Sequence, residues 1–89
     1  MLYMVIETFK NHDARAVYRR YRQLGRMAPQ GLDYLSSWTD TDFARCFQLM
    51  ECSDPLLLEE WMSRWRDLVD FEVVPVVTSR EVADALAEG

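Results

Sequence analysis

The chain has 89 residues, a formal net charge of −5 and 49% hydrophobic residues. This length predicts one domain with a single core, residues 1–89, and the composition is typical of a globular protein rather than a disordered one. The acidic balance disfavours nonspecific binding to nucleic acid or to an anionic membrane surface, because both carry negative charge. No apolar run approaches the roughly 20 residues that span a bilayer.

The cysteines and the N-terminal residues indicate a cytoplasmic protein. Glu7 interrupts the opening apolar run, so we expect no signal peptide. Cys46 and Cys52 lie six residues apart in one expected strand. At about 3.3 Å per residue they are about 20 Å apart, beyond the reach of a disulfide. Two free thiols that pack as small hydrophobic side chains fit a reducing compartment.

The first third of the chain predicts a strand followed by a helix. Residues 2–9 are rich in β-forming side chains. A polar break follows, in which Asn11 or Asp13 is a candidate helix N-cap. Apolar residues then recur every three or four positions, which predicts an amphipathic helix over residues 14–28. Gly25 weakens its last turn before a Pro-Gln-Gly segment ends it.

A hairpin and a second helix are predicted in the middle of the chain. Residues 32–39 and 44–52 are expected strands, and the short turn between them favours antiparallel pairing. Asp54 followed by Pro55 is a typical helix start. The apolar face of this helix carries Leu57, Leu58, Trp61, Trp65 and Leu68.

The C-terminal part predicts a fourth strand over residues 71–78. Pro75 lacks a backbone N–H, so this strand should lie at a sheet edge. Thr78 and Glu81 have the spacing of a capping box, which indicates a short C-terminal helix or tail over residues 79–89.

The element order is therefore β, α, β, β, α, β. It predicts an α+β, ferredoxin-like sandwich, in which two helices cover one face of a four-stranded antiparallel sheet of order 4-1-3-2.

Three of the expected strands carry apolar side chains on both faces. In the first strand one face carries Leu2, Met4 and Ile6, and the other carries Tyr3, Val5 and Phe9. In the third strand the two sets are Phe47 and Leu49 on one face and Cys46, Met50 and Cys52 on the other. In the fourth strand they are Val74 and Val76 on one face and Phe71, Val73 and Val77 on the other. Two helices cover only one face of such a sheet. Because large exposed apolar patches are rare in monomers, we expect a second copy to cover the other face, in a homodimer.

Several segments resemble the domain of unknown function 3303 family. They are Met4–Glu7, Ser37–Trp38, Arg45–Glu51 and, above all, Asp67–Val76. The resemblance implies a ferredoxin-like subunit of the dimeric α/β-barrel kind. Proteins of that architecture include cofactor-independent monooxygenases, small isomerases, haem-handling enzymes and regulatory ligand binders, so the fold alone selects none of these activities.

Polar residues within the strands are the candidate ligand-binding residues. They are Tyr3, Glu7, Tyr34, Trp38, Arg45 and Gln48. A carboxylate among apolar neighbours has a raised pKa and suits a general acid or base, so Glu7 is the candidate catalytic residue. The alternative is an ordinary ion pair between Glu7 and Arg45. The alternation of residues predicts that Tyr34, Ser36 and Trp38 share one face of their strand.

The expected first helix carries a stripe of arginines. Arg15, Arg19, Arg22 and Arg26 follow one another at spacings of four, three and four residues. Guanidinium groups bind phosphates and carboxylates well, so this stripe is a candidate surface for an acidic partner. The alternative is a solvated helix face.

Motifs for metal or cofactor binding are not evident in this sequence. His12 is the single histidine and lies in a polar loop, and we expect no metal and no cofactor. Trp61 and Trp65 are expected in the core.

These observations favour a small homodimeric binding or accessory module for a small, largely apolar molecule. One alternative is a cofactor-independent enzyme that resembles a monooxygenase or an isomerase and uses Glu7. The other is an interaction protein that uses the arginine stripe.

Overall fold

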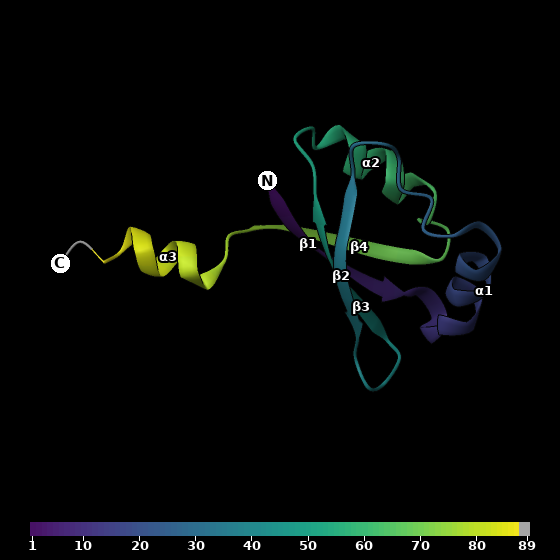
Figure 1. Cartoon of the computed structure of the whole chain (residues 1–89). Helices are drawn as coiled ribbons and strands as arrows, with labels where there is room; N and C mark the ends of the chain where they lie inside the picture. The colour runs from purple at the N-terminus through teal and green to yellow at the C-terminus, as the bar shows by residue number, and fades with distance from the viewer. Residues whose placement is uncertain (88–89) are drawn as a thin grey trace.

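The computed structural model describes residues 1–87 and contains a four-stranded antiparallel sheet with two helices on one face (Figure 1). The elements, in chain order, are β1 (Leu2–Phe9), a 3-10 turn η1 (Lys10–His12), α1 (Ala14–Leu24), β2 (Asp33–Thr39), β3 (Arg45–Glu51), α2 (Leu56–Ser63), β4 (Val69–Val76) and α3 (Ser79–Ala85). The sheet order is β2-β3-β1-β4, which is the predicted order read from the other edge. The α+β, ferredoxin-like prediction is confirmed. Residues 88–89, the end of the expected tail, lie outside the described residues.

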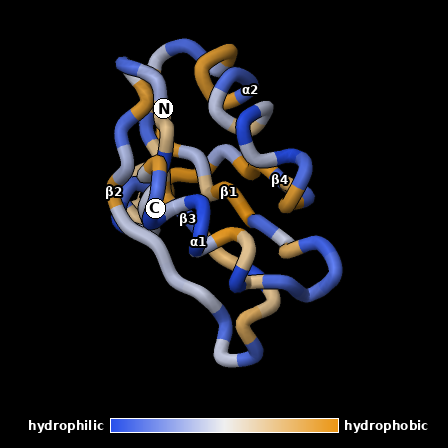
Figure 2. Tube along the Cα trace, turned by 90° about the vertical axis from the view of Figure 1, so that its right-hand side faces the viewer, coloured by the Kyte–Doolittle hydropathy of each residue, from blue (hydrophilic) through white to orange (hydrophobic). Residues whose placement is uncertain are grey.

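The core lies between the sheet and the two helices. Every second residue of β1 is buried there, from Val5 through Glu7 to Phe9. Figure 2 shows hydrophobic positions on β1 and on α2, two of the elements that contribute to this layer. The buried apolar set is Val5, Phe9, Val17, Leu32, Cys46, Met50, Cys52, Leu58, Trp61, Met62, Trp65 and Val69.

Local signals position most helix ends. The Asp13 carboxylate accepts a hydrogen bond from the Ala16 N–H, so Asp13 rather than Asn11 caps α1. Asp54 accepts a hydrogen bond from the Leu56 N–H just before α2, so the Asp-Pro segment does precede the helix, but the N-cap is Pro55, one residue later than predicted. The β4 strand lies at the sheet edge, as Pro75 predicted, but it begins at Val69, two residues earlier than expected.

The first helix is shorter than the sequence pattern predicted. It ends at Leu24, and Gly25 follows with φ 70° and ψ −162°. Residues that carry a Cβ atom rarely adopt this backbone conformation. The prediction that Arg26 belongs to the helical stripe is therefore wrong. Its side chain leaves the helix surface because the chain turns at Gly25.

A bulge changes the faces of β2. Tyr34 pairs with Met50 while Ser36 pairs with Leu49, so Leu35 is an extra residue in the ladder. The prediction that Tyr34, Ser36 and Trp38 share one face is therefore wrong, because one inserted residue reverses the alternation of all side chains beyond it. Tyr34 lies on the helix face, and Ser36 and Trp38 lie on the opposite face.

That opposite face of the sheet, named here the open face, is largely apolar. It carries Leu2, Met4, Ile6, Trp38, Phe47, Leu49, Val74 and Val76. Trp38 is 55% exposed and Val74 is 36% exposed. The chain therefore presents the doubly apolar sheet that the sequence predicted.

The α3 helix stands apart from the rest of the molecule, beyond the end of β4 (Figure 1). The Thr78 hydroxyl accepts a hydrogen bond from the Glu81 N–H, which confirms the predicted cap. No helix within residues 1–87 combines the length and the apolar character that crossing a bilayer requires.

Candidate functional site

Two polar side chains are buried in the centre of the sheet, on its helix face. Glu7 in β1 is 6% exposed and Gln48 in β3 is 7% exposed. In the β1–β3 ladder Gln48 pairs with Val5, two residues from Glu7, so the two side chains are diagonal neighbours. The Gln48 Nε2 donates a hydrogen bond to a carboxylate oxygen of Glu7. A buried polar pair at this position is costly for stability, which makes it a candidate site.

Arg26 extends this pair toward the surface. Its Nε donates to the Gln48 Oε1 at 2.8 Å. Its guanidinium lies 3.7 Å from the centre of the Tyr34 ring and 5.3 Å from that of Tyr21. Among the described residues, its two terminal nitrogens donate no hydrogen bond. An arginine held by its inner nitrogen and by aromatic rings can offer those outer nitrogens to a carboxylate or another anionic oxygen.

The backbone of Arg26 is held by two tryptophans. The indole N–H groups of Trp61 and Trp65 both donate to the Arg26 carbonyl oxygen, at 2.9 and 3.0 Å. Trp61 lies in α2 and Trp65 in the turn that follows it. These bonds tie the segment between α1 and β2 to α2 and to the turn after it, and they fix where the Arg26 side chain begins.

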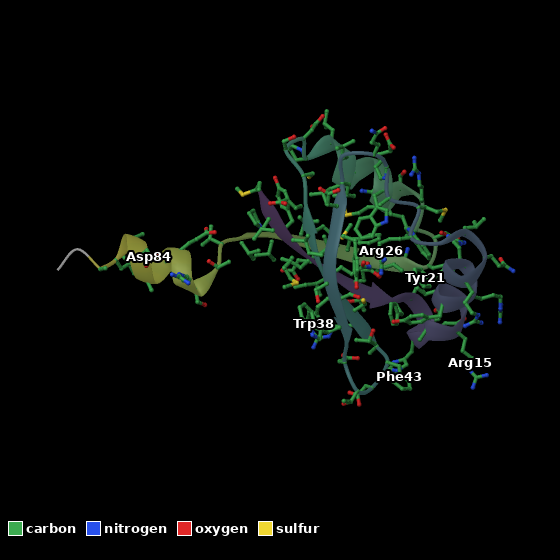
Figure 3. All side chains as sticks on the ribbon, viewed as in Figure 1. Arg15, Tyr21, Arg26, Trp38, Phe43 and Asp84 are labelled. Atoms are coloured by element: carbon green, nitrogen blue, oxygen red, sulfur yellow. The ribbon has the colours of Figure 1, made fainter. Side chains whose placement is uncertain are left out.

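The three polar groups line a cavity of about 60 Å³ between the sheet and the helices. Aromatic rings form most of the remaining wall, namely Phe9, Tyr18, Tyr21, Trp61 and Trp65. Figure 3 shows Arg26 and Tyr21 in the region between the sheet and α1. The volume suffices for a few water molecules or for the polar end of a ligand. Tyr21 and Tyr34 are 42% and 41% exposed, so aromatic surface continues outward beside Arg26.

Burial raises the pKa of Glu7 from 4.5 to about 7, while the hydrogen bond from Gln48 and the charge of Arg26 act in the opposite direction. This carboxyl group can therefore gain or lose a proton near neutral pH. Burial and the neighbouring Glu7 charge raise the pKa of the Cys46 thiol to about 11. Cys46 is therefore a protonated wall residue of the cavity rather than a thiolate nucleophile.

The structure brings together only part of the predicted set of ligand-binding residues. Glu7, Gln48 and Tyr34 gather around Arg26. Tyr3 lies on the same face but pairs with Met50 and Pro75 toward the far end of the sheet, and it does not line the cavity.

Arg45 and Trp38 lie on the open face, away from Glu7. The Arg45 Nε lies 3.4 Å from the Asp40 carboxylate, so Asp40 is its ionic partner. The ion pair between Glu7 and Arg45 considered as an alternative does not form, because neighbouring residues of β3 point to opposite faces.

The remaining arginines of the stripe border a second, larger hollow of about 490 Å³ between α1 and the β2–β3 turn. We call it the α1 hollow, and its lining consists of Ala14, Arg15, Tyr18, Arg19, Arg22, Thr39 and Phe43.

Sequence reasoning missed the roles of three residues at the site. The residue pattern predicts Arg26 on a helix surface. It predicts Trp61 and Trp65 in the core but does not predict that their indole N–H groups donate hydrogen bonds to Arg26. Gly25, one residue before Arg26, was the signal that the helix ends early. His12 lies outside the site, where its Nε2 makes a hydrogen bond with the Asp42 carbonyl oxygen. Within residues 1–87 no three acidic, histidine or cysteine side chains gather as a metal site.

The buried carboxyl group predicts a specific pH dependence of stability. Because the pKa of Glu7 is higher in the folded chain, its favourable contribution is complete below pH 4.5 and is lost as the pH rises toward 7. The Glu7→Gln variant cannot titrate there. Relative to wild type, its free energy of unfolding should rise by about 3 kcal/mol between pH 4.5 and pH 8, as measured by urea denaturation followed by tryptophan fluorescence.

The exposed Glu51 at the end of β3 provides the matched control. The Glu51→Gln variant should keep the wild-type pH profile. Parallel profiles for wild type and Glu7→Gln would contradict the burial of a titrating carboxyl group at Glu7.

Comparison with known proteins gives one match. No curated protein and no solved structure matches the chain. The sequence model of a family described as Domain of unknown function (DUF3303) matches residues 1–89, the whole chain. This match confirms the resemblance of the β1, β3 and β4 segments. The chain therefore belongs to the DUF3303 family.

Proposed function

We propose that this protein is a homodimeric binding module for a small, largely apolar molecule with one polar end. The observation that carries the proposal is the way Arg26 is held. Gln48 binds its Nε, aromatic rings contact its guanidinium group, and two indole N–H groups bind its carbonyl oxygen. Its terminal nitrogens are nevertheless left for another group. Prepositioned polar groups in an aromatic cavity are typical of small-molecule sites.

The cavity and its rim divide the recognition between them. The polar end of the ligand enters the cavity, where Arg26 supplies positive charge and Glu7 supplies a titrating carboxyl group. The apolar body lies over the half-exposed rings of Tyr21 and Tyr34. Exposed aromatic surface of this kind favours a planar or aliphatic body over a strongly polar one.

The open face supports the dimer. Its apolar side chains lie on all four strands, and Trp38 on the edge strand β2 is more than half exposed. Two copies that pack these faces together remove the apolar surface from water in a self-complementary contact, as in dimeric α/β barrels. Two free, buried cysteines accord with a reducing compartment, and we place the protein in the cytoplasm on that ground.

A charge in the centre of the open face should dissociate the dimer. Leu49 lies on β3, a central strand, opposite Met4. In the Leu49→Glu variant both copies bury a carboxylate at the two-fold contact, so the dimer dissociation constant should rise about 100-fold or more. Sedimentation velocity at micromolar concentration measures it.

Ser63→Glu, at the exposed end of α2 in the helix layer, is the control and should sediment as wild type does. Wild-type protein that sediments as a single subunit at these concentrations would contradict the homodimer.

The site itself can be probed with benzoate and hexanoate, which join an apolar body to a carboxylate. Titration with these acids should shift the indole N–H resonances of Trp61 and Trp65, because both bond the Arg26 carbonyl beside the cavity. In Arg26→Leu the apparent dissociation constants should rise about tenfold or more.

Arg66 pairs with Glu59 on the surface, so Arg66→Leu should bind the acids as wild type does. Equal shifts in Arg26→Leu and wild type would contradict the assignment of Arg26 to the ligand.

A cofactor-independent enzyme is a second candidate, favoured by the pKa of Glu7 at about 7 in an aromatic cavity. In that case Glu7 acts as the general acid or base on the bound molecule, while Arg26 stabilises developing negative charge. For a substrate that the protein turns over, Glu7→Gln should lower kcat by about 100-fold or more with little change in binding. Unchanged turnover would remove this role.

A further inference from the structure

The C-terminal helix packs against no other element within residues 1–87. Every residue of α3 is exposed, and its aliphatic side chains Val82 and Leu86 are 42% and 75% exposed. An isolated helix of seven residues is marginal in water even when its N-terminus is well capped. A stable α3 therefore requires a surface that is supplied from elsewhere.

The α1 hollow is the complementary unoccupied surface. Five basic side chains of the described residues lie beside a carboxylate partner, whereas Arg15, Arg19 and Arg22 do not. These three arginines line one hollow together with Tyr18 and the 66% exposed ring of Phe43. The hollow thus offers both positive charge and apolar surface, in a protein whose net charge is −5.

The α3 helix has the chemistry that fits this hollow. Val82 and Leu86 are one turn apart on one flank, and Glu81 and Asp84 are one turn apart on the neighbouring flank. Ala85 lies between the two flanks, and Arg80 lies one turn before Asp84, on the far side of the acidic flank. A helix laid in the hollow can place its aliphatic flank against Phe43 and its acidic flank against the arginines. Opposite charges and matching apolar surfaces make this pairing specific.

The two surfaces cannot meet within one chain. Figure 3 shows Asp84 at the opposite end of the molecule from Arg15 and Phe43, and the molecule extends 50 Å along its longest axis. A second copy, turned end for end, brings its α3 to this end. Because both copies carry both surfaces, two identical contacts form around a two-fold axis.

We propose that the C-terminal arm, residues 77–87, of each copy docks in the α1 hollow of the other copy. This inference rests on the homodimer of the proposed function and adds a second contact to it. Tyr18 lines both the α1 hollow and the cavity that holds Glu7. The arm of one copy therefore covers one wall of the other copy's ligand site, so that each site is complete only in the dimer.

Cysteine cross-linking tests the exchange of arms directly. Phe43→Cys and Leu86→Cys chains, one of them carrying a tag, are coexpressed and mildly oxidised, and a disulfide between differently sized chains is sought on a non-reducing gel. We expect such heterodimers in the mixture and little cross-linking when either variant is expressed alone. The native cysteines are buried and do not compete.

A matched control replaces Phe43→Cys by Gln30→Cys, an exposed position outside the α1 hollow. This pair should give no heterodimer. Absence of the link between residues 43 and 86, or a link between two Leu86→Cys chains, would overturn the arm exchange. If the protein still sediments as a dimer, the arm proposal alone falls, whereas a wild-type monomer removes the homodimer as well.

Discussion

The arrangement of the site depends on one backbone carbonyl group, that of Arg26. Two indole N–H groups donate to it, one from α2 and one from the turn after α2. The carbonyl follows the end of α1, where helix geometry no longer supplies a partner, so without the tryptophans it would be left without a protein donor. Through these two hydrogen bonds, α2 and the turn after it hold the segment between α1 and β2 in place. The Arg26 side chain then starts close to Gln48, and the rings of Tyr21 and Tyr34 confine its remaining freedom.

This placement explains how a carboxyl group is tolerated in the core. Glu7 loses almost all contact with water, which favours its protonated form. The Gln48 hydrogen bond and the Arg26 charge favour the ionised form and offset part of the effect of burial. The pKa of Glu7 therefore lies at about 7. Apolar residues of similar size in place of Glu7 and Gln48 would fill the core without burying an ionisable group. A polar network that costs stability and still opens toward half-exposed aromatic rings supports the proposed binding site.

Two surfaces of the molecule remain without a partner in the single chain, and both are consequences of the topology. The sheet has apolar residues on both faces but helices on only one, because its two crossover helices lie on the same side. The chain then leaves the edge strand β4 at the end of the sheet remote from α1, so α3 has nothing beneath it. The proposed two-fold assembly would cover both surfaces at once, since each copy would supply what the other lacks. In the proposed dimer, the same two-fold contact covers the open face and places the arm beside the cavity of the other copy.

The sequence by itself determined the elements, their order and the edge position of β4. The Asp54-Pro55 start, the Thr78 cap and the missing N–H of Pro75 act on near neighbours, so their effects can be predicted without the fold. Only the tertiary structure decided the site. The bulge at Leu35 depends on how β2 pairs with β3, and it reversed the predicted face of Tyr34 relative to Trp38. Glu7, Arg26, Gln48 and Trp61 lie far apart in the chain. Gly25 marks the end of α1 locally, but their meeting depends on strand register, which no local pattern of residues specifies.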